Sequence, residues 1–161
     1  MIKKIISLLI KLKLIERTFA YGIKSKNGAV IYYNDPYGVK IMNLVNKIRK
    51  EIDMLMHNNE AYQIYSAVEK TAKIEGDIAE VGVYKGGSAK LICEAKETKN
   101  LHLFDTFNGL PNLSEKDNPN QFHAGQYSAS LEKVKDYLKE YPNVFIYKGM
   151  FPATANSIRN R

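Results

Sequence analysis

The sequence has too few cysteines and histidines for most disulfide and metal chemistry. Cys93 is the single cysteine, so one chain can form neither an internal disulfide nor a cysteine-rich zinc site. This usage fits a reducing compartment, and we expect a cytoplasmic protein in which Cys93 is packed as a small apolar residue. His57, His102 and His123 share no spacing typical of metal ligands. We expect His102 to be structural and regard His123, in a long loop, as a candidate for substrate contact.

Long hydrophobic runs are also missing. The apolar stretch near the N-terminus, residues 5–10, is far shorter than the roughly 20 residues of a membrane span. Lys11 and Lys13 interrupt the apolar pattern directly after it, and no small-residue cleavage site comes next. We therefore expect neither a transmembrane nor a secretory segment.

The positive charge is concentrated in the first third of the chain. The 161 residues, a length that fits one domain, carry a formal net charge of +7. Residues 1–50 contain eleven Lys/Arg and two Asp/Glu, whereas residues 51–161 contain thirteen and fifteen. The basic character therefore belongs to the N-terminal segment, and the remainder is close to neutral.

Residues 2–15 have the pattern of a basic amphipathic helix. The residues that share its apolar side are Ile2, Ile5, Ile6, Leu9 and Leu12. Such a helix packs on its own domain, lies in a homo-oligomer interface, or contacts a membrane surface peripherally. Nucleic-acid binding is disfavoured, because the lysines interleave with the apolar side and no RNA- or DNA-binding motif is present.

The rest of the chain alternates between strand and helix patterns. A small hairpin or loop is expected at 21–37. Helical periodicity or capping signals predict helices at 41–55, 60–71, 86–95 and 130–141, with Asn58 or Asn59 capping the second and Ser130 the last. Short apolar runs predict strands at 77–83, 101–104 and 144–147, with a long loop at 106–128. The β-α-β-α-β order predicts an α/β protein whose three parallel strands form half of a doubly wound sheet.

The end of the first of these strands and the turn after it, residues 80–88, read EVGVYKGGS. A dinucleotide fingerprint needs glycine where Tyr84 stands, and Glu80 would repel a pyrophosphate. A phosphate-binding P-loop matches at Gly82 and Gly87 but has Ser88 where its lysine must be. Neither phosphate motif is therefore satisfied.

S-adenosylmethionine fits the same residues better, because it has no phosphate and carries a sulfonium cation. Gly82, Gly86 and Gly87 supply a close backbone turn, and Glu80 supplies negative charge. Asp105, at the end of the second strand and 19 residues after Gly86, is placed to accept hydrogen bonds from ribose hydroxyls.

At this point the sequence resembles a known family. Residues 76–89, GDIAEVGVYKGGSA, look like the first motif of the macrocin O-methyltransferase (TylF/MycF-type) family, whose members are class I S-adenosylmethionine-dependent methyltransferases. The resemblance continues in LFDTFNGLP at 103–111, and in residues 130–134 and 147–152, and covers about residues 40–155. It implies a Rossmann-like class I methyltransferase fold.

The resemblance also implies roles for matching positions. The residues expected to bind the cofactor are Glu80, Gly82, Tyr84, Gly86, Gly87, Ser88, Asp105, Thr106 and Phe107. Met150 and Phe151, after the third strand, are expected to border the adenine.

For activity, the resemblance implies O-methylation of a hydroxyl on a sugar or similar metabolite, aided by Mg²⁺. In the family, aspartates after the fourth strand hold the cation. We therefore expect the metal ligands and the catalytic base beyond Arg161, and read the chain as a basic segment, 1–36, joined to an incomplete S-adenosylmethionine-binding domain, 37–161. Two alternatives remain: a catalytically inert fragment or binding module, and an NAD-dependent oxidoreductase, which Tyr84 and Glu80 disfavour.

Overall fold

The computed structural model describes residues 22–25, 28–31, 35–112, 114–115 and 117–158. The helix predicted at 2–15, and with it the expected membrane-surface contact, lies outside these residues. None of the helices in the described part of the chain combines the length and apolar character that a membrane crossing requires.

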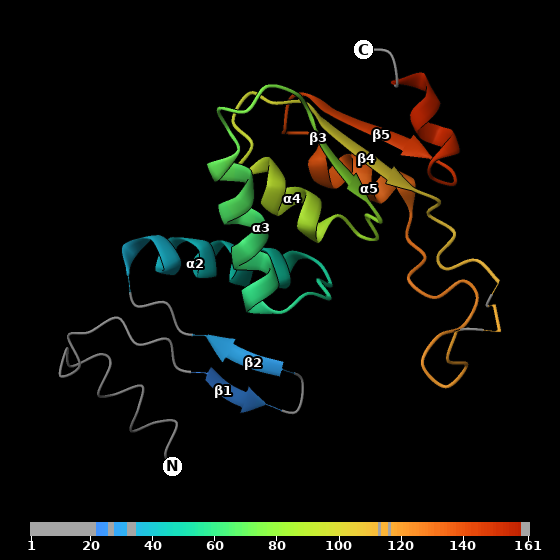
Figure 1. Ribbon diagram of the computed structural model, residues 1–161, viewed down its shortest axis with the longest axis horizontal. Coiled ribbons are helices and arrows are strands. Elements are labelled where there is room, and N and C mark those ends of the chain that lie inside the picture. Colours follow the sequence, from blue (N-terminus) through green and yellow to red (C-terminus); the bar gives the residue numbers. More distant parts are fainter. Residues whose placement is uncertain (1–21, 26–27, 32–34, 113, 116, 159–161) are drawn as a thin grey trace.

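Three parallel strands form the centre of the fold (Figure 1). They are β3 (Ile78–Val81), β4 (Leu101–Asp105) and β5 (Val144–Lys148), with β4 between the other two. The crossover helices are α4 (Gly87–Cys93) and α5 (Leu131–Leu138). The predicted Rossmann-like α/β half-sheet, with its β-α-β-α-β order, is confirmed.

Helices cover one face of this sheet and make the core. Leu101 and Leu103 of β4 are completely buried and belong to one apolar cluster with Leu91 of α4 and Val134 of α5. The helix α3 (Asn58–Lys70) adds Tyr65 to the same cluster. Alternation along β4 therefore directs every second side chain toward the helices.

The opposite face carries stacked rings. His102 lies against the rings of Phe145 and Tyr147, with centroid distances of 5.3 and 5.8 Å. Its Nε2 lies 2.9 Å from Asp77 Oδ2 and its Nδ1 lies 3.0 Å from the Tyr147 hydroxyl. Because His102 is buried and both ring nitrogens have partners, the prediction that it is structural is confirmed.

The helix α2 (Pro36–Glu51) begins as its sequence favours, because Asp35 accepts a hydrogen bond from the Gly38 N–H at 2.8 Å and proline occupies the first turn. It ends at Glu51, so the prediction that it extends to Leu55 is wrong. Leu55 repeats the helical spacing, but it faces a cavity rather than the core. A periodic apolar pattern does not distinguish these two environments.

The cap of α3 also differs from expectation. His57 is the N-cap, and its N–H donates to Glu60 Oε2 at 2.7 Å. Asn58 is already helical, and its side-chain oxygen accepts a hydrogen bond from Arg49. The predicted cap at Asn58 or Asn59 is therefore wrong, because a tertiary contact engages the Asn58 side chain.

The remaining boundaries are close to those expected. Ser130 caps α5 by accepting from the Lys133 N–H at 3.3 Å, as predicted, but the helix ends at Leu138 and a tight turn continues to Tyr141. The hairpin expected within 21–37 is present as β1 (Gly22–Ser25) paired with β2 (Gly28–Ile31). The domain boundary at 36/37 stays a prediction.

Candidate functional site

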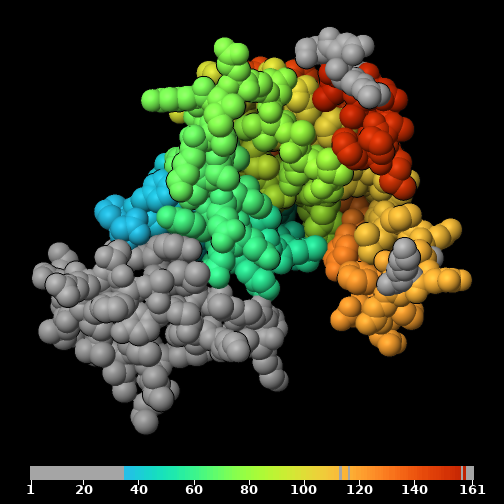
Figure 2. Space-filling view, in the orientation of Figure 1, coloured from blue at the N-terminus to red at the C-terminus, as the bar shows by residue number. Residues whose placement is uncertain are grey.

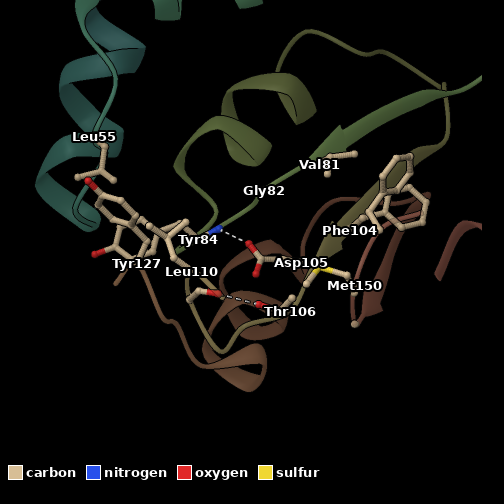
Figure 3. Close-up of a pocket in the computed structure, with 13 residues that line it drawn as sticks. Leu55, Val81, Gly82, Tyr84, Phe104, Asp105, Thr106, Leu110, Tyr127 and Met150 are labelled. Atoms are coloured by element: carbon tan, nitrogen blue, oxygen red, sulfur yellow. Dashed lines mark hydrogen bonds between the residues drawn. The ribbon is translucent and has the colours of Figure 1, made fainter. Parts of the chain in front are cut away.

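A cavity of about 420 Å³ opens at the carboxyl ends of the three parallel strands (Figure 3). This is the edge at which open α/β sheets bind their ligands. Its walls come from the ends of β3, β4 and β5, the connection between α2 and α3, and the long loop: Leu55, Val81, Gly82, Tyr84, Phe104, Asp105, Thr106, Gly109, Leu110, Tyr127, Gly149, Met150 and Phe151. The volume is within the usual range for small-molecule sites, about 300–1,000 Å³.

A second cavity of about 310 Å³ adjoins the first. It lies between the α2–α3 connection and the turn after β3, and is lined by Asp53, Met54, Leu55, Met56, Gly82, Val83, Tyr84, Gly87 and Ser88. Leu55, Gly82 and Tyr84 line both spaces. The two spaces therefore meet at these three residues.

Asp105 ties the strand ends together. Its Oδ2 accepts the backbone N–H groups of Val83 at 2.6 Å and Tyr84 at 2.9 Å, and its Oδ1 accepts that of Phe107 at 2.7 Å. Its carbonyl oxygen accepts the Gly149 N–H at 2.9 Å. Figure 3 shows the carboxylate directed at the Tyr84 backbone. Because a carboxylate has about four lone-pair sites, one remains for a ligand.

Gly82 leaves the cavity floor open. Its φ of +90° lies in the left-handed region that favours glycine, and a Cβ built on it would meet no atom within 4 Å. The glycine therefore keeps bare backbone exposed to whatever occupies the two cavities.

Glu80 holds a buried carboxyl behind the second cavity. Ser88 donates its hydroxyl to Glu80 Oε1, whereas Glu80 Oε2 is buried and has no hydrogen-bond partner. Burial raises the pKa of Glu80 to about 7, the negative charge of Asp105 also acts to raise it, and the Ser88 hydrogen bond opposes both. One oxygen of this carboxyl thus lacks a hydrogen-bond donor, and the other is bonded to Ser88, which lines the second cavity.

Tyr84 links the two segments that overhang the cavities. Its hydroxyl donates to Asp53 Oδ2 at 3.2 Å, and its ring meets the Tyr127 ring edge-on at 5.9 Å. Lys85 pairs with the same Asp53 oxygen at 3.2 Å. Since Asp53 belongs to the α2–α3 connection and Tyr127 to the long loop, Tyr84 holds both near the strand ends.

The long loop closes on itself close to the sheet. The Leu110 N–H donates to Gln126 O at 2.8 Å, and the Gly125 N–H donates to Leu110 O at 2.9 Å. Gly109 permits this approach, because its Cβ would lie 2.3 Å from Gly125 O. The loop, yellow to orange in Figure 2, projects from the body of the domain beyond this closure.

Gly109→Ala is expected to destabilise the protein by about 2 kcal/mol, through a backbone clash added to left-handed strain. Gly125→Ala is the matched control, since both glycines have a φ of +78° but a Cβ at Gly125 would meet only one atom, at 4.0 Å. Urea unfolding should show about 1 kcal/mol less destabilisation for the control. Equal losses would show that the close approach is not rigid.

The structure brings most of the predicted cofactor residues together. Gly82, Tyr84, Asp105 and Thr106 line the first cavity, as do Met150 and Phe151. Gly82, Tyr84, Gly87 and Ser88 line the second.

Three of the predicted cofactor residues, and the candidate for substrate contact, do not line either cavity. Glu80 lies behind Ser88. Gly86 is the left-handed N-cap of α4, and the buried Phe107 reaches Asp105 through its backbone. His123, the candidate for substrate contact, lies on the exposed part of the loop and on neither wall.

Sequence reasoning missed several wall residues: Asp53, Met54, Leu55, Met56, Leu110, Tyr127 and Gly149. The apolar run at 54–56 carried no separate signal, because the helical period predicts a helix through Leu55. No spacing points to Asp53 or Tyr127, which meet Tyr84 only through the fold. Among the residues that the structure describes, no group of three His, Cys, Asp or Glu side chains is placed to hold a metal ion.

Comparisons with known proteins identify the family of this chain. A family model described as macrocin-O-methyltransferase (TylF) matches residues 55–160. Among solved structures, the calicheamicin methyltransferase CalS11 is 14% identical with a TM-score of 0.47, over 73% of this chain and 60% of that one. The O-methyltransferase NovP is 17% identical with a TM-score of 0.48, over 89% of this chain and 64% of that one.

The chain thus spans less than two thirds of the length of either structure. No curated protein sequence matches it. Because the family model covers well over half of the chain, the protein belongs to the macrocin O-methyltransferase (TylF) family.

Proposed function

We propose that the protein is an S-adenosylmethionine-dependent O-methyltransferase whose two joined cavities hold the cofactor. One observation carries the proposal: the family match, residues 55–160, contains the ends of all three strands and the glycine turn that build the first cavity. Because one fold can host many functions, the proposal depends on whether these residues suit this cofactor.

The residues fit a cofactor that carries positive charge and no phosphate. Glu80 offers a carboxyl oxygen without a partner, and the bare backbone of Gly82 lets a ligand approach closely. Asp105 retains acceptor capacity for a ribose hydroxyl, and Thr106 lies beside it. Met150 offers an exposed apolar wall suited to an adenine ring.

The two cavities suggest how the cofactor is oriented. We place its adenosyl end in the first cavity, against Asp105 and Met150, and its methionyl end in the second, against Ser88. The sulfur then lies near Gly82 and Tyr84, which line both spaces. When bound, the cofactor supplies a methyl group on a sulfonium centre. The described residues bind and orient it and place a negative charge nearby.

The proposed acceptor is a hydroxyl group of a sugar or similar small metabolite. Mg²⁺, which the family resemblance implies, does not fit the described residues, because they contain no group of three suitable side chains.

Isothermal titration of the full chain tests the proposal. S-adenosylmethionine should bind, whereas NAD should not, because Tyr84 stands where a dinucleotide-binding turn needs glycine and the acidic Glu80 lies on β3 just before that turn. Absence of binding by the folded chain would refute the proposal. Binding without methyl transfer to any hydroxyl-bearing acceptor would favour a binding module.

Gly82→Ala should weaken this binding about tenfold, since its Cβ projects into the space shared by the cavities. Gly76→Ala is the matched control, because Gly76 also has a positive φ of +108° and open space at its Cβ but lines neither cavity. Both variants carry similar backbone strain. Equal affinities in titration would place the ligand elsewhere.

A further inference from the structure

The carboxyl group of Glu80 is the least compensated polar group near the cavities. It belongs to β3, and its only hydrogen bond in the described part of the chain comes from the Ser88 hydroxyl to Oε1. No lysine, arginine or histidine among the described residues forms an ion pair with it. Burying an anion without a cation costs free energy. Burial therefore favours the protonated, uncharged form of Glu80.

The groups that face Glu80 reinforce this state. Asp105, on the neighbouring strand β4, adds negative charge. Burial raises the pKa of the Cys93 thiol, on α4, to about 12, and the negative charge of Glu80 also acts to raise it. The thiol therefore stays neutral. Among the residues that the structure describes, Ser88, also on α4, is the one group that favours the ionised carboxylate. Since the pKa of Glu80 is about 7, close to half of the molecules carry its proton at neutral pH.

The position of Glu80 connects this proton to the ligand. Ser88, which donates to Glu80, lines the second cavity. Val81 and Gly82, the next two residues along the chain, line the first. Glu80 lines neither cavity, yet it lies directly behind Ser88, so a cation in the second cavity would act on its carboxyl across that hydroxyl and favour the ionised form.

We propose that Glu80 releases its proton when a cationic ligand occupies the joined cavities, so that cofactor binding is linked to proton release. The O–H bond of Glu80 breaks, the proton passes to the buffer, and the carboxylate remains as the counter-ion of the ligand. The proposal rests on the proposed function, because it takes S-adenosylmethionine as the cation. Beyond that function, it states that a cationic ligand binds more tightly than its neutral analogues because Glu80 ionises when the cation binds.

Isothermal titration of the full chain with S-adenosylmethionine at pH 7, in two buffers of different ionisation enthalpy, measures the proton count without any variant. About half a proton should be released per ligand bound, since about half of the Glu80 side chains carry one. Between pH 5.5 and 7.5, affinity should rise about twentyfold if bound Glu80 returns to its ordinary pKa. The ligand's own amino group, with a pKa near 8, stays mostly protonated in this window.

A neutral ligand provides the first control. 5′-Methylthioadenosine keeps the adenosyl part but has neither the sulfonium nor the amino group. It should release almost no proton and show little pH dependence. An equal proton count for both ligands would overturn the proposal.

Variants assign the proton to a residue. Glu80→Gln should bind S-adenosylmethionine more weakly at pH 7.5 and without pH dependence, whereas Glu140→Gln, at an exposed position just after α5, should behave as the wild type. Ser88→Ala should move the midpoint of the pH dependence upward, because its hydroxyl favours the carboxylate. An unchanged proton count in Glu80→Gln would overturn the assignment.

The two hypotheses fail differently. If the wild type does not bind S-adenosylmethionine at pH 7.5, the proposed function is refuted and this inference with it. If it binds with no proton released and with constant affinity from pH 5.5 to 7.5, only the role of Glu80 is refuted.

Discussion

Asp105→Ala is expected to lower the free energy of unfolding by about 3 kcal/mol in the absence of any ligand. The substitution removes one carboxylate that accepts the N–H groups of Val83, Tyr84 and Phe107. Each buried donor left without a partner costs about 1–3 kcal/mol, and water entering the cavity recovers part of this loss. Urea unfolding of the wild type and the variant gives the difference directly.

Two further variants separate this role from ordinary loop capping. Asp117 also accepts a backbone N–H, from Ser114 at 2.8 Å, but it lies in the exposed loop, so Asp117→Ala should cost less than about 1 kcal/mol. Asp105→Asn keeps one acceptor oxygen and turns an amide toward another donor, so its loss should be intermediate. Equal losses for Asp105→Ala and Asp117→Ala would show that Asp105 does not hold the strand ends together.

Asp105, the last residue of β4, therefore has a structural role beside its proposed ligand contact. The sequence predicts that Asp105 holds the ribose, because an acid at that position does so in related folds. The structure shows that three of its lone-pair sites already serve the backbone. Loss of cofactor binding in Asp105→Ala would therefore combine a lost ligand contact with a distorted turn, and only its stability effect isolates the structural part.

The strand and helix order was predictable because each element carries its own signal. Short apolar runs such as Leu101–Phe104 read as buried strands, and the carboxyl-edge rule for α/β sheets then placed Gly82 and Asp105 at one site. These inferences need only local pattern and topology. They are the part of the site that a single sequence can establish.

The rest of the site depends on contacts between segments distant in sequence. Asp53 and Tyr127 lie 74 positions apart, yet both contact Tyr84, and no local pattern records this. Similarly, the local sequence predicts Asn58 as a helix cap, but Arg49 engages its side chain. Leu55 continues a helical period although it faces a cavity. In each case the local sequence is compatible with more than one role for the residue, and tertiary packing determines which role it takes.

Glu80→Gln is expected to make the ligand-free protein more stable at pH 8 while weakening cofactor binding. The pKa of Glu80 is raised from 4.5 to about 7 in the folded protein, mainly by burial. Between these values the native state holds a proton that the unfolded chain has lost, so stability falls as pH rises from about 4.5 to 7 and is level above that. Over this range the loss amounts to about 3 kcal/mol.

Glutamine resembles the protonated carboxyl in shape and has no charge, so it should abolish this part of the pH dependence. In urea unfolding at pH 4.5 and pH 8, the difference between Glu80→Gln and the wild type should grow in favour of the variant by about 3 kcal/mol. Glu140→Gln, at an exposed position, should show no such growth. A constant difference for Glu80→Gln would mean that Glu80 has the same pKa in the folded and the unfolded protein, and its burial would then have to be relieved by a cation or by water that enters the cavity beside Ser88.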